Sequence, residues 1–598
     1  MNGEFARIEL VSHPRHLDKV QEGSLIVSSD WITYHLACRR GFSARRLDAL
    51  LAEWPQELGD PAQHHIRVCE WMYDEHGQDM TRFEGVSLGK LFVRSVTFFS
   101  LGYGLVYYGL SRLLATHAAS ELVVHDVRLR HDLLSDQAKL HLAERVASLH
   151  GVRVVSRLDS LGQDHPDYPE FFKGSGAPQE EKGVKAWLRQ AYAQAIEALF
   201  RLRASRRKRV LLMLGWIATR QILDARRQED PAPILIANMS PKAPGFLWES
   251  WKQGTVLAAL PRRFLKRRHS KRLDEIRNQF SRDTKKAVLG PVEEATRSFV
   301  SEQIFGQGWL EQKAREVLSY LALFDKHCCS SAVIGDSTND TSRIIAEIAK
   351  HRQIPVDEML NGMFLTSQRY DSRSGDSFTP PVIDRILTRG SCDERWIGLT
   401  KAKVSCQRVG YPALACLKKP AREMNPKGNA LILPIYADCD DVLASLNNIF
   451  DHLTATVDAL KAFGCAVIRI KLHVGLPNLA YYKRVLETAG IDVAVTNQGG
   501  LLEHLDWADF VVGPVNSGAM LETMATGKPY YPFLPEPSLI APELIDGVSI
   551  FKAPGELVAW LREGRVPDAK AALEFYASST SLPDTGRAFW KAMHREAA

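Results

Sequence analysis

Residues 464–533 alternate between strand-like apolar runs and helix-like segments, and this alternation constrains the fold more than any other feature of the chain. The runs Ala466–Val474 and Asp509–Pro514 are rich in β-branched residues, as buried strands are. A helix-like segment follows the second run and begins at Ala519. Strands that alternate with helices predict a parallel sheet covered by helices, and such sheets bind ligands outside the carboxyl ends of their strands.

Candidate phosphate-binding residues follow these two runs. Lys471 and His473 end the first run two residues apart, which places both on one face of a strand. Asn516, Ser517 and Gly518 precede the helix-like segment, where backbone N–H groups and the helix dipole favour an anion. A histidine at a strand end and a serine at a helix N-cap also occur for structural reasons alone. We expect these five residues to bind an anion such as a phosphate.

The two motifs together also resemble a known family. IKLHVG (Ile470–Gly475), followed by VVGPVNSGAMLETMATGKPYY (Val511–Tyr531), is similar to the donor half of bacterial GT-B glycosyltransferases that build surface polysaccharide. Within that group the motifs are most similar to enzymes that use CMP-activated ulosonic acids, which are Kdo and sialic-type sugars. The resemblance runs from Ile383 to the C-terminus.

In that family a His-Pro pair and a pair of hydroxyl residues bind the nucleotide phosphate. Here Val474 follows His473, and Asn516-Ser517 stands in the place of the hydroxyl pair. The resemblance implies that Glu522, which we expect in the first turn of the helix, bonds a ribose hydroxyl. An acid near a helix N-terminus also stabilises the helix dipole, so this residue has a structural alternative.

The whole-chain pattern predicts an α/β protein with two doubly wound, Rossmann-like domains that face each other across a cleft, and the resemblance implies that this architecture is of GT-B type. A helical N-terminal region and a helical insertion are expected in addition. The expected parts are a helical region over 1–110, a Rossmann-like acceptor domain over 111–370 with a basic insertion at about 249–326, a linker over 365–382, a nucleotide-sugar domain over 383–575, and a terminal helix over 584–598 that returns to the first domain.

A catalytic carboxylate should end a strand of the acceptor domain. Asp336 follows the apolar run SAVIG, Asp340 lies one turn later and also suits a helix N-cap, and Asp126 follows ELVVH. Such a carboxylate would deprotonate the acceptor in an inverting enzyme or act as the nucleophile in a retaining one, and the sequence leaves both open. Arg343 and Arg389 would bind a sugar carboxylate through paired hydrogen bonds, although each side chain could instead serve packing.

No metal site is expected from the sequence. The cysteines and histidines lack metal-ligand spacing, and Asp438-Cys439-Asp440-Asp441 precedes a helix and fits its capping region. We therefore expect catalysis without a metal or another cofactor, with protein donors at the leaving phosphate.

Basic residues are concentrated in Arg201–Arg209 and in the longer run Arg262–Lys286, although the net charge is only +6. This run is either a solvated helix face or a surface for an anionic partner, such as an acidic membrane leaflet or a lipid-linked glycan. Nucleic acid is not expected, because no aromatic residues are interleaved with the charge in a known reader motif. The start of the chain lacks the apolar core of a signal peptide, so we expect a cytoplasmic protein with peripheral contact with the inner membrane through this run.

These features together predict a metal-independent glycosyltransferase. Its donor would be a nucleotide sugar, with a CMP-linked Kdo or other ulosonic acid favoured. Its acceptor would be a surface glycan such as lipopolysaccharide, O-antigen or capsule, and a lipid-linked form of that glycan is one option. Two alternatives stay open. One is a teichoic-acid type phosphotransferase that uses a CDP-polyol, and the other is an inactive GT-B scaffold that binds glycan.

Overall fold

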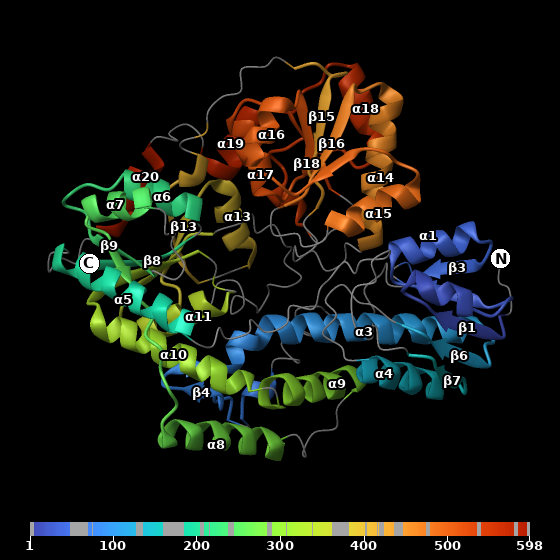
Figure 1. Cartoon of the computed structure of the whole chain (residues 1–598), viewed down its shortest axis with the longest axis horizontal. Coiled ribbons are helices and arrows are strands. Elements are labelled where there is room, and N and C mark those ends of the chain that lie inside the picture. Colours follow the sequence, from blue (N-terminus) through green and yellow to red (C-terminus); the bar gives the residue numbers. More distant parts are fainter. Residues whose placement is uncertain are drawn as a thin grey trace. The chain divides into compact units, whose positions relative to one another are not determined.

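The chain folds around three parallel sheets and a small antiparallel ribbon, all within the residues that the computed structural model describes (Figure 1). It divides into two compact units, called here the first unit (Met1–Asp60, Phe98–Pro178 and Lys418–Ala569) and the second unit (Pro61–Thr97, Gln179–Leu417 and Lys570–Ala598). The described residues are 5–47, 49, 70–74, 76–126, 136–158, 184–203, 209–214, 216–236, 244–283, 290–306, 308–335, 337, 339–360, 382–400, 403–414, 417, 424–435, 446–473, 479–534, 540–578 and 584–594.

The first unit begins with a five-stranded parallel sheet, called here the N-terminal sheet. Its strands lie in the order β3-β2-β1-β6-β7. The bounds are β1 (Arg7–Leu10), β2 (Leu25–Ser28), β3 (Ser43–Arg46), β6 (Glu121–Val124) and β7 (Arg153–Ser156), with the helices η1 (Pro14–Lys19), α1 (Trp31–Arg39), α3 (Val93–Thr116) and α4 (Asp136–Leu149).

This sheet corrects the expectation of a helical region over 1–110. The strands β1, β2 and β3 are four residues long, and β3 reads Ser-Ala-Arg-Arg. Glu9 interrupts the apolar residues of β1, yet it is fully buried because His125 pairs with it. Short strands that carry charged residues give little of the apolar periodicity that identifies a strand.

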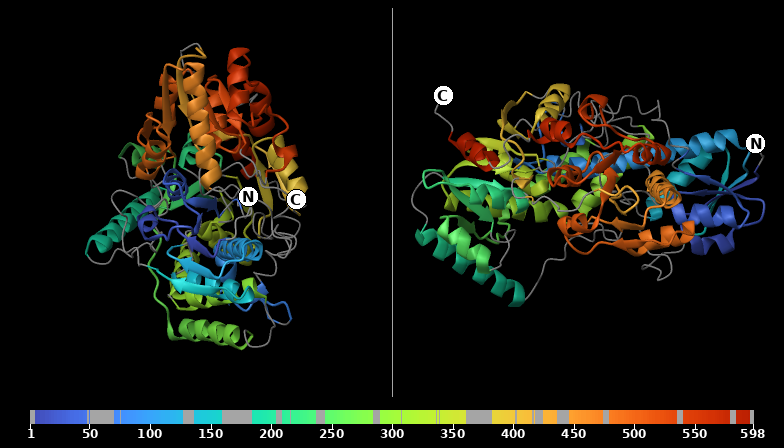
Figure 2. Two further views of the ribbon diagram at one scale, coloured as in Figure 1. Left: turned by 90° about the vertical axis from the view of Figure 1, so that its right-hand side faces the viewer. Right: turned by 90° about the horizontal axis from the view of Figure 1, so that it is seen from above.

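The second parallel sheet of the first unit is called here the nucleotide sheet, after the nucleotide-binding residues that the sequence analysis expects on it. Its order is β17-β16-β15-β18-β19, and every neighbouring pair is parallel. The helix α14 packs against β16 of this sheet, and its segment is drawn in orange in the two further views (Figure 2). The bounds are β15 (Asn429–Ile432), β16 (Val467–Lys471), β17 (Ala494–Thr496), β18 (Phe510–Pro514) and β19 (Tyr530–Phe533), with α14 (Leu446–Phe463), α15 (Leu479–Ala489), α16 (Leu501–Trp507), α17 (Gly518–Ala525), η9 (Pro542–Leu544) and α18 (Pro554–Arg562).

The two sheets of the first unit are joined by residues that follow strand ends. Asp30 caps α1 directly after β2, and its carboxylate accepts a 2.5 Å hydrogen bond from the Tyr481 hydroxyl on α15. Trp31 donates to Asp451 on α14 at 2.7 Å, and Arg46 also bonds Asp451. The helices α1, α14 and α15 each follow the carboxyl end of a parallel strand, so this junction lies on the carboxyl side of both sheets.

The second unit holds a seven-stranded parallel sheet, called here the central sheet, in the order β10-β9-β8-β11-β12-β13-β14. Its strands are β8 (Arg209–Met213), β9 (Ala232–Ile236), β10 (Val256–Ala258), β11 (Cys329–Ile334), β12 (Val356–Glu358), β13 (Arg385–Thr388) and β14 (Ser405–Arg408). The ribbon of β4 (Arg82–Phe83) and β5 (Val86–Ser87) belongs to the same unit.

Helices cover the central sheet, and the terminal helix α20 packs into its core. Trp590 is buried among core residues that include Val210 and Leu387, and its indole N–H donates to the Ile222 carbonyl at 2.6 Å. None of the described helices combines the length and apolarity that crossing a lipid bilayer requires. The helices of this unit are η4 (Glu70–Met72), η5 (Gly89–Phe92), α5 (Val184–Arg203), α6 (Trp216–Asp224), α7 (Pro244–Lys252), α8 (Arg267–Asp283), α9 (Pro291–Val300), the π-helix η6 (Ser301–Gly306), α10 (Trp309–Lys326), α11 (Asp340–His351), α13 (Ser391–Thr400), η8 (Pro412–Leu414), α19 (Ala569–Ala577) and α20 (Thr585–Met593).

The predicted α/β class with doubly wound, Rossmann-like sheets is confirmed, while the predicted domain bounds are corrected. The strands β6 and β7, expected with the central sheet, pair with β1 instead. The strands β13 and β14, expected to open the nucleotide-sugar domain, extend the central sheet, so the units divide at Leu417/Lys418. The insertion at about 249–326 is mostly helical, but its strand β10 pairs with β9. Sequence spacing alone does not reveal which distant strand a new strand joins.

Candidate functional site

The strand order of the nucleotide sheet reverses at β15, which lies between β16 and β18. The chain runs outward from β15 to β17 and then returns to β18 on the other side of β15. Open α/β sheets bind ligands in the crevice outside the strand ends at such a point. His473 follows β16 and Ser517 follows β18, so the predicted phosphate-binding residues lie on the two strands that flank β15.

The N-terminus of α17 forms one side of this point. Ser517 is the N-cap, and its hydroxyl oxygen accepts from the Ala519 N–H at 3.2 Å, which is the capping bond of the structural alternative. Residues 516–519 are half-buried and therefore accessible. Capping uses a single N–H group, and the first turn of a helix leaves further N–H groups and a partial positive charge for an anion. The geometry is therefore compatible with both capping and anion binding.

The approach to α17 depends on a close contact at the end of β18. The Tyr530 hydroxyl donates to the Pro514 carbonyl at 3.0 Å and passes over Gly513. A Cβ atom at Gly513 would lie 2.2 Å from that hydroxyl oxygen, so any larger residue would overlap with it. Gly513 therefore allows Tyr530 to hold the turn that presents Asn516 and Ser517.

His473 lies on the other flank, two residues after the last residue of β16. The His473 side chain is exposed to solvent. Partial burial of its ring, and to a smaller extent the nearby charge of Lys471, lower the pKa of His473 below its ordinary value. The ring is therefore largely neutral at pH 7, and an anion bound beside it would favour its protonated form.

Lys471 departs from the expectation that it shares a ligand-facing position with His473. Its side chain is buried, and its ammonium donates to the Leu472 carbonyl at 2.8 Å and to the Asn497 carbonyl at 3.4 Å. Burial lowers the pKa of Lys471, an effect that the Glu503 carboxylate partly opposes. The ammonium therefore mainly fastens the end of β16, and its charge acts on His473 from within the sheet.

Glu522 lies four residues after Gly518, beyond the first turn of α17, which holds no acid. This corrects its predicted position and removes the simple dipole-stabilising alternative, which applies to the first turn. Burial raises the pKa of Glu522. A half-buried carboxyl group with a raised pKa suits hydrogen bonding to a neutral hydroxyl group, as a ribose would offer.

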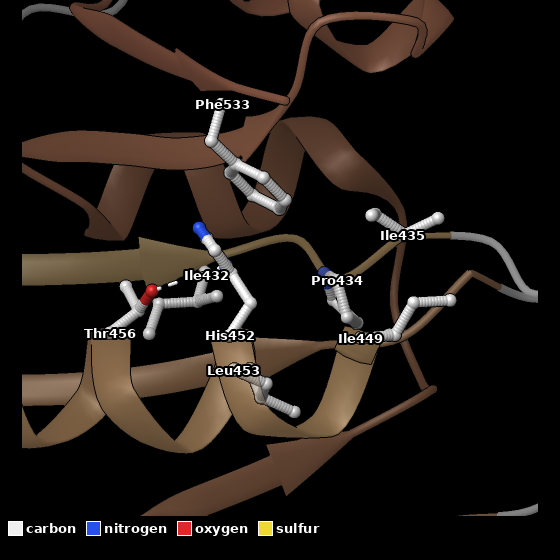
Figure 3. Close-up of a pocket in the computed structure, with 8 residues that line it drawn as sticks. All are labelled: Ile432, Pro434, Ile435, Ile449, His452, Leu453, Thr456 and Phe533. Carbon is white, nitrogen blue, oxygen red and sulfur yellow. Dashed lines mark hydrogen bonds between the residues drawn. The ribbon is translucent and has the colours of Figure 1, made fainter. Parts of the chain in front are cut away.

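A small apolar pocket lies beside this point, under the end of β15 (Figure 3). The His452 ring stacks on the Phe533 ring at a centroid distance of 4.2 Å, and its Nδ1 lies 3.4 Å from the Thr456 hydroxyl oxygen. Burial lowers the pKa of His452 to about 4, and its Nε2 has no hydrogen-bond partner among the described residues. The lining residues are Ile432, Pro434, Ile435, Ile449, His452, Leu453, Thr456 and Phe533.

The sequence analysis missed this pocket. The i, i+4 spacing of His452 and Thr456 on the helix after β15 was the available signal, because such pairs share one helix face. A neutral imidazole with one unused nitrogen among apolar walls can accept or donate a single hydrogen bond to a ligand that enters the pocket.

Asp126 lies at the reversal point of the N-terminal sheet, where β1 runs between β2 and β6. It follows β6, is 5% exposed, and its backbone N–H donates to the Leu10 carbonyl at 3.3 Å. The neighbouring His125 Nε2 lies 2.7 Å from the Glu9 carboxylate, and both side chains are fully buried. Burial alone would raise the pKa of Glu9, but hydrogen bonds from His125, Gln21 and Ser24 outweigh it and lower that pKa. The sequence analysis did not anticipate this buried pair beside Asp126.

The other predicted acids belong to the second unit or lie outside the described residues. Asp340 is the first residue of α11, and its carboxylate lies 2.8 Å from the Lys313 ammonium. The N-cap of α11 is Asn339, which accepts from the Thr341 N–H at 3.0 Å, so the alternative of a capping Asp340 is corrected. Asp336 lies outside the described residues.

Both predicted sugar-binding arginines are engaged within the second unit. The buried Arg343 bonds Glu347 at 3.0 Å. The buried Arg389 bonds both carboxylate oxygens of Asp393, at 2.7 and 3.0 Å, and stacks on the Tyr411 ring. These partners correct the prediction that the two guanidinium groups are presented to a sugar carboxylate, because each already pairs with a carboxylate of the fold.

Within the described ranges, no group of three or more His, Cys, Asp or Glu side chains is arranged to hold a metal ion. The segment Asp438-Cys439-Asp440-Asp441 lies outside those ranges. Val474 also lies outside them.

No protein-family model matches the chain, and no curated protein matches it by sequence. Solved structures similar to it include MurG from Acinetobacter baumannii, with 10% identity and a TM-score of 0.33, over 65% of this chain and 100% of MurG. The lipopolysaccharide outer core galactosyltransferase WaaB has 11% identity and a TM-score of 0.36, over 64% of this chain and 99% of WaaB. The UDP-GlcNAc 2-epimerase from Neisseria meningitidis, bound to UDP-GlcNAc, has 12% identity and a TM-score of 0.32, over 65% and 94%. At these values the likeness identifies neither a substrate nor a reaction for this chain.

Proposed function

We propose that the chain is a glycosyltransferase of GT-B type that binds a nucleotide-sugar donor at the carboxyl edge of the nucleotide sheet and transfers the sugar to a bacterial surface glycan. One observation carries this proposal. His473 and the N-terminus of α17 follow the two strands that flank β15, where the strand order reverses.

The donor phosphate would be bound between these two groups. The free N–H groups of the first turn of α17 and its dipole would stabilise the phosphate, with Ser517 and Gly518 at the point of contact. His473, with its lowered pKa, would donate to the phosphate and take up a proton as the nucleotide leaves. Glu522 would bond a ribose hydroxyl. Protein donors would thus supply the charge stabilisation that a metal ion provides in other transferases.

For the catalytic carboxylate we propose Asp126, ahead of Asp340 and Asp336. Two observations support this order. Asp126 belongs to the same compact unit as His473, and the two sheets of that unit are joined by residues on their carboxyl sides. Asp340, in contrast, is paired with Lys313 in the second unit. Asp336 stays an alternative on sequence grounds alone.

The identity of the donor is a finer proposal. The resemblance of Ile470–Gly475 and Val511–Tyr531 to enzymes that use CMP-activated ulosonic acids favours a CMP-linked donor. The pairing of Arg343 with Glu347 and of Arg389 with Asp393 favours a donor without a carboxylate. A CDP-polyol or a UDP-sugar is such a donor, and we keep this class as the second candidate.

A panel of nucleotides separates these candidates. CMP, CDP and UDP would each be titrated against the full-length protein while its thermal unfolding is followed. A ligand at 100 times its Kd should raise stability by about 2.7 kcal/mol, which a shift of the melting temperature detects. We expect the largest shift with CMP. The largest shift with CDP or UDP would move the donor to the second candidate, and no shift with any nucleotide would contradict the proposed function.

A further inference from the structure

The segment Arg262–Lys271, called here the basic segment, is one of two dense runs of positive charge in the chain, and its cations are exposed. It contains no acidic residue, and its six cations equal the formal net charge of +6 for the whole chain. The rest of the chain is therefore formally neutral, since 6 − 6 = 0. The exposed cations are Arg262, Arg263, Lys266, Arg267, Arg268 and Lys271.

These cations are little used within the fold. Arg268 lies 3.6 Å from the Glu84 carboxylate, and its Nε donates to the His269 ring at 3.1 Å. The other five cations form no ion pair with any described residue. Surface cations that serve local stability usually have an acid three or four residues away on the same helix. Lys271 has Asp274 and Glu275 at that spacing on α8, whereas the other five cations of the segment have no acid three or four residues away.

The position of the charge also opposes the helix that follows. The segment runs into the first turn of α8, which begins at Arg267 and holds no acid in that turn. The N-terminus of a helix carries a partial positive charge, so acids stabilise it and cations destabilise it. A sequence selected only for the stability of α8 would not place Arg267 and Arg268 there. An external anion would remove this repulsion.

The segment is fixed to the body of the second unit, because the opposite face of α8 is buried. Leu273, Ile276 and Phe280 are buried, and the Phe280 ring contacts the edge of the Trp71 ring at 6.0 Å. Arg272 also donates to the Met80 and Arg82 carbonyls, at 3.1 Å each. The apolar face of α8 is therefore used in the fold and is not free to enter a membrane. What remains for a partner is the basic segment itself.

Phe264 distinguishes between the classes of anionic partner. Its side chain is 83% exposed and therefore does not contribute to the apolar core. In the sequence it lies between Arg263 and Lys266. Soluble polyanions such as nucleic acid or an acidic glycan offer the segment charge but no apolar layer. A bilayer offers anionic headgroups above an apolar layer, and aromatic side chains favour the boundary between the two.

We propose that the basic segment docks the protein on an anionic lipid surface. The guanidinium and ammonium groups would contact lipid phosphates, and the Phe264 ring would enter the headgroup boundary. The attraction would fall with salt, because exposed charges are screened over about 10 Å at 0.1 M ionic strength. This inference uses residues outside the nucleotide sheet and does not depend on the proposed function.

Vesicle co-sedimentation of the full-length protein tests the proposal. Vesicles of phosphatidylcholine alone are compared with vesicles that also contain phosphatidylglycerol. The variants are the triple R262Q/R263Q/K266Q and the single F264S. The matched control is K427Q/K461Q/K483Q, which removes three exposed lysines that have no ion pair among the described residues. The control and the triple variant therefore have the same net charge.

The parent protein and the control should bind the anionic vesicles and not the neutral ones. The triple variant should lose roughly a hundredfold in affinity, since each basic residue near an anionic surface contributes about fivefold or more. The F264S variant should bind several times more weakly at unchanged net charge. Thermal unfolding with CMP should be the same for the parent and all variants, which separates this result from a failure of the nucleotide site.

Three results would overturn the proposal. The first is a parent protein that does not distinguish anionic from neutral vesicles. The second is equal loss of binding in the triple variant and in the control, which would indicate unspecific charge attraction. The third is full vesicle binding by F264S together with displacement of the parent from vesicles by a short DNA duplex, which would assign the segment to soluble polyanions.

Discussion

The indole N–H of Trp31 donates to the carboxylate of Asp451 at 2.7 Å, and this bond joins the N-terminal sheet to the nucleotide sheet. Trp31 is 3% exposed and packs in the core of the nucleotide sheet beside Phe450. Burial alone would raise the pKa of Asp451, but the His35 ring 3.7 Å away, the hydrogen bond from Trp31 and the charge of Arg46 outweigh it and lower that pKa. The helix after β2 is thereby fixed against the helix after β15, although their residues are about 420 positions apart in the chain.

Removal of this acceptor should destabilise the first unit. D451A leaves the buried indole N–H of Trp31 without its partner, and an unsatisfied buried donor costs about 1–3 kcal/mol. Urea unfolding of the parent and the variant would measure the difference. The control is D458A, which removes an exposed acid from the same helix. Equal stability of D451A and D458A would show that the junction contributes nothing.

The lowered pKa of Asp451 also predicts a pH dependence. Since the folded pKa lies below the unfolded value of about 3.9, the carboxylate stabilises the fold above that pH, and the contribution is lost as pH falls through the folded pKa. The stability difference between the parent and D451N should therefore shrink between about pH 4 and pH 2. A difference that stays constant over this range would contradict the assignment.

The phosphate role of His473 predicts a pH-dependent affinity. The ring has a lowered pKa without ligand, and a bound phosphate should raise it, so affinity should increase as pH falls towards the pKa of the free ring. H473Q should weaken nucleotide binding more than tenfold, because a hydrogen bond to a charged partner contributes about 1.5–3 kcal/mol. Calorimetric titration at several pH values measures both effects. In H473Q the contribution of the His473 ring to the pH dependence of nucleotide affinity should be absent. Only the contribution from titration of the nucleotide phosphate should remain.

The role of Ser517 can be separated from simple capping by a second N-cap in the same chain. S517A and N339A each remove a capping side chain, from α17 and α11, and each should lower stability by about 1 kcal/mol. Only S517A should also weaken nucleotide binding, by about tenfold. If both variants bind nucleotide like the parent, Ser517 is a cap and nothing more.

The nucleotide sheet was predictable because the residues of its main strands show the pattern of a buried strand without reference to distant parts of the chain. β18 is a continuous apolar run, and β16 is rich in β-branched residues although it also holds Arg469 and Lys471; a polar turn follows each strand. The N-terminal sheet was not predictable, because Glu9 is tolerated in β1 only through His125, which lies 116 residues away. Likewise, the partners of β13 are set by pairing over distance, which local sequence does not encode.

The arginine prediction failed for a different reason, since its correction was visible in the sequence. Arg343 and Glu347 are four residues apart on α11, the spacing at which opposite charges pair on a helix. Arg389 and Asp393 have the same spacing, although Arg389 precedes the first residue of α13. The burial that turns such a pair into a fixed element of the fold, in contrast, appears only in the structure.

Gly513 should tolerate no side chain while Tyr530 keeps its hydroxyl group. In G513A the new Cβ would lie 2.2 Å from the Tyr530 oxygen, and such overpacking costs about 1–3 kcal/mol. Y530F removes that oxygen, so the double variant should be more stable than the sum of the two single changes predicts. Relief should be partial, because the Tyr530 Cζ and the Leu433 Cβ also lie within 3.2 Å of the added atom. Strict additivity in urea unfolding would contradict this packing.

The last prediction concerns the acid that performs the chemistry. If Asp126 activates the acceptor, D126N should lower the rate of sugar transfer by about 100- to 10,000-fold, the range of general acid–base catalysis, while nucleotide affinity stays unchanged. The substitution keeps the size of the side chain, and Asp126 is 5% exposed, so thermal unfolding must be measured in parallel. A loss of rate without a loss of stability separates chemistry from folding.

Two comparison variants make this test decisive. D340N breaks the ion pair with Lys313 and should lower stability without lowering the transfer rate of the folded fraction. D336N tests the alternative that rests on the sequence alone. Full activity of D126N together with an inactive D336N would move the catalytic role to the second unit. Full activity of all three variants would mean that none of these carboxylates acts on the acceptor, because an essential base cannot be neutralised without a loss of rate.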